Sequence, residues 1–154
     1  MRTVVIGIGN EYRHDDAAGI AVVQRLRALA PPGVELADTD GEATALIELW
    51  SGADLAIVVD AVAGTAEPGH VYRLGLPQRA AASHGPSASH QASLGDAVAL
   101  ARALDRMPHQ LVLFGIQVAH TGPGLGLSVA VGHAVGAVTA EITGILRRLP
   151  SAAR

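Results

Sequence analysis

Short runs of β-branched and apolar residues alternate along this chain with longer segments whose apolar residues recur every three or four positions. The runs predict strands at residues 3–8, 34–37, 54–60, 71–74 and 110–118. The helical spacing predicts helices at residues 16–30, 43–50, 90–104 and 127–149. Strands that alternate with helices indicate an α/β fold. We expect three layers: a mostly parallel, twisted sheet of about five strands with helices on both faces.

Two stretches depart from this alternation. Residues 71–74 follow the strand at 54–60 after a connection too short for a helical crossover, so we expect this one strand to run antiparallel to its neighbour. Residues 77–89 are the least regular part and are rich in Ala and Ser. We interpret them as a mobile loop over the edge of the sheet.

Composition narrows the class of protein. The 154 residues are most simply one domain, 1–154, and with 49% hydrophobic but 3% aromatic residues the core must be aliphatic. The net charge is −3, and all eleven basic residues are Arg, so the chain lacks the basic face of a nucleic-acid-binding protein. With no Cys, disulfides and thiolate metal sites are excluded.

The first residues and the apolar stretch near the end of the chain indicate where in the cell we expect the protein. The N-terminus enters an apolar strand without a charged segment and a long apolar run, so we expect no signal peptide. The apolar stretch 128–149 contains Glu141 and Arg147, which favours an interior-facing helix over a membrane span. We therefore expect a cytoplasmic protein with no membrane partner, most simply a monomer.

Candidate chemistry gathers where successive strands end. Asp15 and Asp16 follow the first strand, Asp60 closes the third, and His90 opens the helix after the irregular loop. Because parallel strands end at one edge of a sheet, these loops should be neighbours. Two carboxylates and an imidazole suit Ni, Zn, Mn or Fe with open positions. The carboxylates could equally act without a metal, one activating water and another group handling the leaving-group proton.

Structural roles compete with each of these assignments. Asp15 has the position of a helix cap, and Asp16 that of a first-turn acid favoured by the helix dipole. His90 could be a solvent-exposed residue, and the nearby His84 is an equally plausible ligand. The motif from Gly7 to Asn10 lacks the third glycine of a dinucleotide-binding loop. Four further histidines are interpreted as structural or exposed: His70, His109, His120 and His133.

Several of these motifs, in this order, resemble those of the hydrogenase maturation endopeptidases, the processing proteases of nickel-iron hydrogenase large subunits. The resemblance extends over nearly the whole chain. The matching residues are Gly7-Ile8-Gly9-Asn10, Asp15-Asp16 with Gly19, Val58-Val59-Asp60-Ala61, His90-Gln91 with Leu94 and Asp96, and Gly115-Ile116-Gln117.

The resemblance implies an endopeptidase that removes a short C-terminal peptide from the nickel-loaded large subunit. Carried over by position, the residues that recognise nickel are Asp16, Asp60 and His90, with Asp16 and Asp60 as the catalytic pair. The nickel would come from the substrate, and Zn or Cd could replace it in vitro. Whether hydrolysis is of the aspartic type or metal-assisted stays open.

Two other functions remain as alternatives. A peptidyl-tRNA hydrolase-like enzyme also opens with Gly-x-Gly-Asn, but it needs a basic face for phosphates, which this composition does not favour. A non-catalytic nucleotide-binding module could hold a phosphate at the start of the first helix. The acidic pair Asp15-Asp16 would repel that phosphate.

Overall fold

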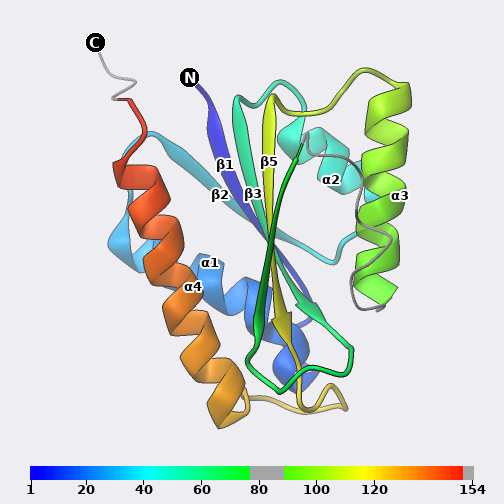
Figure 1. The fold of residues 1–154 in the computed structure, drawn as a ribbon, viewed down its shortest axis with the longest axis vertical. Helices are drawn as coiled ribbons and strands as arrows, with labels where there is room; N and C mark the ends of the chain where they lie inside the picture. The colour runs from blue at the N-terminus through cyan, green and yellow to red at the C-terminus, as the bar shows by residue number, and fades with distance from the viewer. Residues whose placement is uncertain (77–88, 151–154) are drawn as a thin grey trace.

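The computed structural model describes residues 1–76 and 89–150, with the backbone alone for residues 76 and 89–93. Within these residues the chain forms one five-stranded sheet covered by helices on both sides (Figure 1). The strands are β1 (Thr3–Ile8), β2 (Val34–Thr39), β3 (Leu55–Val62), β4 (Val71–Leu76) and β5 (Gln110–Gln117). The helices are the short 3-10 helix η1 (His14–Ala17), α1 (Ala18–Leu29), α2 (Ala43–Trp50), α3 (Ser89–Ala103) and α4 (Val129–Arg147).

The strand order across the sheet is β2-β1-β3-β5-β4. The first four of these strands run parallel, and β4 lies antiparallel to β5 at the edge. The predicted fold class, including its antiparallel strand, is confirmed. All four parallel strands end at the lower end of the sheet in Figure 1, which we call the carboxyl edge; the opposite end is the amino edge.

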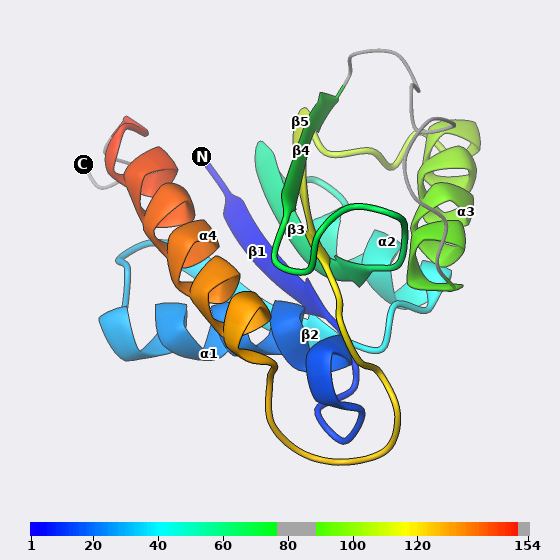
Figure 2. The same ribbon diagram turned by 60° about the horizontal axis from the view of Figure 1, so that its bottom comes forward.

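The sheet separates two hydrophobic cores because successive residues of a strand point to opposite faces. From β3, Ile57 and Val59 pack with α1 and α4, whereas Ala56 and Val58 pack with α2 and α3. Figure 2 shows these two helix pairs on either side of the sheet. The same alternation assigns Asp60 to the face covered by α2 and α3.

Among the described helices, α4 is the one long and apolar enough to cross a membrane by length and composition. One stripe of this helix is buried in the core shared with α1: Val131, Val135, Val138 and Ile142. As the sequence predicted, α4 turns an apolar face toward the interior of the fold.

Two helix starts differ from the sequence-based prediction. The helix expected from residue 16 begins instead with η1 and continues as α1 from Ala18. The turn at residues 38–41 predicts Asp40 as the cap of α2, and that prediction is wrong. Gly41 turns the chain with φ of +96°, so that Glu42 becomes the N-cap and accepts hydrogen bonds from Thr44 N at 2.7 Å and Ala45 N at 3.2 Å.

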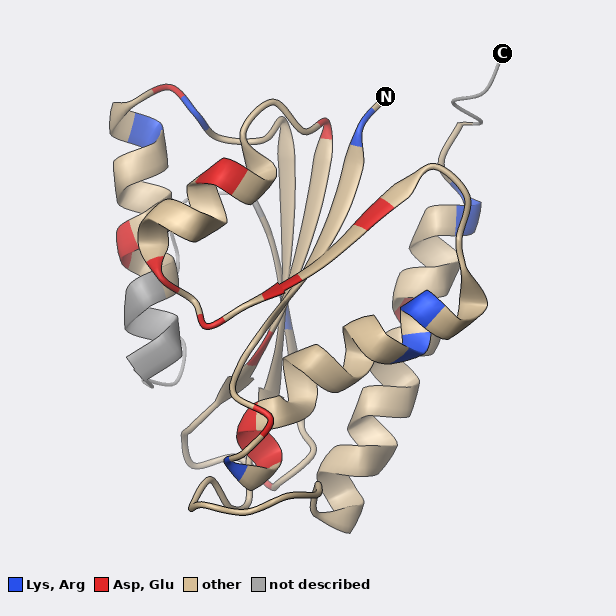
Figure 3. Cartoon of the chain, turned by 180° about the vertical axis from the view of Figure 1, so that it is seen from behind, with Lys and Arg blue, Asp and Glu red and all other residues tan. Residues whose placement is uncertain are grey.

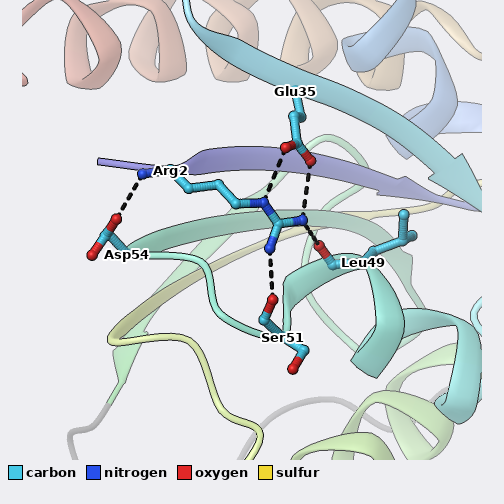
Figure 4. A network of polar contacts seen from close by, with 5 residues as sticks. All are labelled: Arg2, Glu35, Leu49, Ser51 and Asp54. Atoms are coloured by element: carbon cyan, nitrogen blue, oxygen red, sulfur yellow. Dashed lines mark hydrogen bonds and ion pairs between the residues drawn. The ribbon is translucent and has the colours of Figure 1, made fainter. Parts of the chain in front are cut away.

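At the amino edge, Arg2 joins three segments of the chain (Figure 4). Its guanidinium binds both carboxylate oxygens of Glu35 on β2, at 3.0 and 3.1 Å, and donates to the carbonyls of Leu49 and Ser51. Its backbone N–H donates to Asp54 Oδ2 at 2.6 Å, just before β3. This network joins the neighbouring segments at the end of the sheet opposite to the predicted site.

Candidate active site

The connection from β1 to α1 is shaped by close backbone packing. A Cβ on Gly9 would lie 2.0 Å from the carbonyl oxygen of Asp16, and a Cβ on Gly19 would lie 2.3 Å from that of Val59. Only glycine allows these contacts. The start of α1 therefore lies directly against β3, one residue before Asp60. The missing side chain of Gly9 leaves room for the turn that carries Asp16.

This packing brings the two predicted carboxylates to the same edge. Asp16 lies on η1, and Asp60 lies near the end of β3, two residues before its last residue; they are 8% and 3% exposed. Figure 3 shows acidic residues on η1 at this end of the molecule. Burying a carboxylate is costly unless hydrogen bonds or a cation compensate, so two of them at one strand edge are a strong signal of a site.

The third predicted residue, His90, lies in the first turn of α3. His109 N donates to Ala53 O at 3.0 Å, which places the start of β5 at the amino edge. Because α3 leads into β5 there, it begins at the carboxyl edge, on the face to which Asp60 belongs (Figure 1). The backbone of His90 is thus at the predicted edge. Its side chain, the alternative ligand His84 and residues 77–88 of the predicted loop 77–89 lie outside the described residues, and Ser89 is the first residue of α3.

The described side chains alone do not assemble a metal centre: no group of three or more His, Asp or Glu among them could hold an ion. A three-ligand site at this edge must therefore draw on a side chain beyond that part, and His90 is the predicted one. The structure describes the side chains of Asp16 and Asp60, which offer carboxylate oxygens. A borderline metal such as nickel accepts such hard oxygen ligands.

Asp15 has a role that the sequence did not reveal. It does not cap a helix; neither η1 nor α1 has a side-chain cap. Its fully buried carboxylate accepts hydrogen bonds from Ala119 N (2.9 Å), His120 N (3.0 Å), Ser128 N (2.7 Å) and Ser128 Oγ (2.9 Å). Burial raises the pKa of Asp15, but the hydrogen bonds from Ser128, Ala119 and His120 outweigh this, and the pKa lies below its ordinary value.

Further contacts join the same two connections. His14 N donates to Gly124 O at 3.0 Å, and Arg13 Nε donates to Thr121 O at 3.1 Å. The rings of His14 and His120 lie 4.5 Å apart, and His14 keeps a positive φ of 48°. We call this set, with Asp15, the loop clasp. It fixes the connection from β5 to α4 against the segment that carries Asp16.

Gln117, at the end of β5, is a second residue whose role was missed. It is buried, and its Nε2 donates to Gly64 O and Val118 O, both at 3.3 Å. Two carbonyl acceptors fix the orientation of the amide, because the opposite orientation would set oxygen against oxygen. Its Oε1 is buried and accepts no hydrogen bond from the described residues, so a polar acceptor stands at the carboxyl edge. The matched motif Gly115-Ile116-Gln117 was the available signal.

Comparison with known proteins agrees with this arrangement. A family model described as HycI, hydrogenase maturation protease, matches residues 20–145, a range that includes Asp60 and His90 and begins just after Asp16. The hydrogenase 2 maturation protease of Escherichia coli K12 is 27% identical over 150 residues, 96% of this chain and 92% of that protein. The hydrogenase expression/formation protein HupD of Bradyrhizobium diazoefficiens is 30% identical over 121 residues, 75% of this chain and 62% of that protein.

Solved structures give the same result. The hydrogenase maturating endopeptidase HybD from Escherichia coli superposes with a TM-score of 0.80 at 26% identity, covering 96% of this chain and 93% of that one. The solution structure of an endopeptidase from Escherichia coli superposes with a TM-score of 0.84 at 26% identity, with the same coverage. HybD from Thermococcus kodakarensis, 22% identical with a TM-score of 0.78 and covering 95% of this chain and 99% of that one, shares the fold.

Proposed function

The chain belongs to the hydrogenase maturation protease family, a family of endopeptidases, and from that premise we propose that it removes a short C-terminal peptide from the nickel-loaded large-subunit precursor of a nickel-iron hydrogenase. The single observation that carries the proposal is the pair of buried carboxylates, Asp16 and Asp60, held at the carboxyl edge by the packing of Gly19 on Val59.

The nickel of the substrate is the feature by which the enzyme recognises its target in this proposal. Asp16 and Asp60 would supply oxygen ligands and His90 a nitrogen ligand, a donor set that suits a borderline divalent metal. The backbone position of His90, at the same edge and on the face of Asp60, is compatible with this role. Recognition of a metal in the precursor would confine cleavage to large subunits that are already loaded.

Hydrolysis requires a water molecule to attack the carbonyl carbon of the scissile peptide bond. One of the two carboxylates would take the proton from this water, and a proton would then pass to the departing amine as the C–N bond breaks. A nearby metal would supply Lewis acidity and lower the pKa of bound water. We propose Asp16 and Asp60 as the catalytic residues, in either an aspartic-type or a metal-assisted reaction.

Family membership favours this function over the two alternatives from sequence, the peptidyl-tRNA hydrolase-like enzyme and the nucleotide-binding module. The acidic residues of η1 also disfavour the nucleotide-binding module. A phosphate at the start of the first helix would meet η1, whose first turn carries two buried acids, Asp15 and Asp16. We further propose a cytoplasmic monomer, since the substrate must reach the edge of the sheet.

The test is to incubate the protein with its cognate large-subunit precursor, nickel-loaded or nickel-free, and to follow the precursor mass. We expect loss of a C-terminal peptide from the loaded form alone. An intact loaded precursor would overturn the function. Separately, Asp16→Asn, Asp60→Asn and His90→Ala should each weaken binding of Ni, Zn or Cd, measured by calorimetry. Unchanged affinity in all three would overturn the ligand assignment.

A further inference from the structure

Three large apolar side chains lie in solvent beside the candidate active site. Tyr12, Leu125 and Val129 are 65%, 71% and 77% exposed. Tyr12 lies between β1 and η1, Leu125 in the connection from β5 to α4, and Val129 is the first residue of α4. We call these three residues the apolar rim. Single exposed apolar residues are normal in soluble proteins. These three differ because the segments that carry them lie side by side and are held by hydrogen bonds.

The segments that carry the rim lie side by side. Gly124 N, next to Leu125, donates to Tyr12 O at 2.8 Å, and Arg13 forms an isolated bridge with Gly124. Ser128, next to Val129, is held by Asp15 through two hydrogen bonds. Figures 1 and 2 both show the connection from β5 to α4 running beside η1 at the carboxyl edge. The segments that carry the rim are therefore adjacent to one another and to the segment that bears Asp16.

The rim is held in place by polar contacts, together with Leu127, which is partly buried and packs against the core. Between Ala119 and Ser128 the connection has no helix or strand, and none of its residues is buried. Ordering such a segment costs conformational entropy. Here the loop clasp, with the buried carboxylate of Asp15, offsets that cost. A preorganised surface loses less entropy on binding, which is the property expected of a docking site.

From this arrangement we propose that the apolar rim is a docking surface for the folded body of the precursor protein, next to the segment to be cut. The inference rests on the proposed function. Its support is the position of the rim beside Asp16 and its charge: Glu11 and Arg13 flank Tyr12 with opposite signs. A neutral apolar surface with an exposed Tyr fits a protein partner, whereas a phosphate polymer or an anionic membrane would require a basic one.

The test compares rim variants with matched variants at the amino edge. Tyr12→Ser and Leu125→Ser remove apolar area from the rim. Leu29→Ser, at the end of α1, and Leu104→Ser, directly after α3, do the same at exposed positions far from it. Binding of the nickel-loaded cognate precursor is measured by biolayer interferometry and its cleavage by mass spectrometry. Thermal unfolding checks that all four variants are folded.

We expect each rim variant to bind the precursor about tenfold more weakly and to raise KM with little change in kcat. The two amino-edge variants should match the wild type. If the wild type cleaves and the rim variants bind and cleave equally well, the docking surface is wrong while the proposed function stands. If the wild type binds without cleaving and the rim variants lose binding, the function is wrong while the docking surface stands. A wild type that neither binds nor cleaves overturns both.

Discussion

Asp15 and Ser128 are joined by two hydrogen bonds across 113 residues of sequence: the backbone N–H of Ser128 donates at 2.7 Å and its hydroxyl at 2.9 Å. This contact links the connection that carries Asp16 to the start of α4. Because α4 is packed into the core, the contact also fixes η1 relative to the main body of the fold. The geometry of the candidate site therefore depends on a residue with no role in the chemistry.

Replacing Asp15 by Ala should be strongly destabilising. It would leave the backbone N–H groups of Ala119, His120 and Ser128 without their acceptor, at a cost of about 3 kcal/mol in the free energy of unfolding. Ser128→Ala removes only the hydroxyl bond and should cost about 1 kcal/mol. Urea unfolding measures both. Asp40→Ala, at an exposed position, is the control, and equal stability of the Asp15 and Asp40 variants would contradict the clasp.

Asp15 should also make stability depend on pH. Its pKa is lowered in the folded protein, so the unfolded chain binds this proton more readily, and the stabilisation is present above the unfolded pKa of about 3.9. It is then lost as the pH falls through the lower folded value. The difference in unfolding free energy between wild type and Asp15→Asn should therefore shrink from pH 5 to pH 2.

Other carboxyls share this acid dependence, so the difference between the two proteins is the informative quantity. Hydrogen bonds lower the pKa values of Glu35, through Arg2, and of Glu42, through Thr44. The contributions of Glu35 and Glu42 to the unfolding free energy are the same in wild type and Asp15→Asn, so they cancel in the difference. A difference that stays constant over the whole range would show that Asp15 does not titrate as described.

Gly19 is the second structural residue on which the site depends. In Gly19→Ala the new methyl group would lie 2.3 Å from Val59 O, a backbone atom next to Asp60, so α1 must shift. We expect a loss of about 2 kcal/mol and slower cleavage of the precursor. Gly132→Ala on α4 is the matched control, because its Cβ meets no atom within 4 Å. That variant should gain about 0.5 to 1 kcal/mol and cleave normally.

The sequence predicts those features of the fold that depend on residues close together in the chain better than those that depend on contacts between distant segments. The runs Val4–Ile8 and Leu55–Val59 are apolar on both faces, and such local patterns correctly predict the buried parallel strands. The order of the motifs correctly predicts the family. The strand that was predicted to close with Asp60 continues to Val62, so Asp60 lies near the end of β3. The carboxyl-edge rule brings the backbone of His90 to the same edge without any knowledge of side chains.

Contacts between distant segments were beyond the sequence. Asp15 resembles a helix cap locally, but its hydrogen-bond partners lie more than a hundred residues away and could not be inferred from spacing. At the start of α2, the sequence pattern favoured Asp40 as the cap, whereas Glu42 is the cap. The left-handed turn at Gly41 decided between them, and that conformation is set by the neighbouring structure rather than by the motif.

The amino edge should contribute to stability and not to activity. Arg2→Met removes hydrogen bonds to Glu35, Leu49 and Ser51 and should cost about 1 kcal/mol, since the side chain is partly exposed. Arg27→Met breaks a single exposed ion pair with Asp38 and should cost less than about 0.5 kcal/mol. Unfolding in urea and cleavage of the precursor are compared, and a loss of activity in folded Arg2→Met would be unexpected.

The central claim is that Asp16 and Asp60 act together at the carboxyl edge, and the most direct measurement is the single-turnover rate of precursor cleavage. Asp16→Asn and Asp60→Asn keep the size of each side chain and remove its charge. With nickel-loaded precursor, each should cleave about a hundredfold or more slowly than the wild type, while Asp40→Asn should cleave at the wild-type rate. Folded Asp16→Asn and Asp60→Asn variants that cleave as fast as Asp40→Asn would contradict the account.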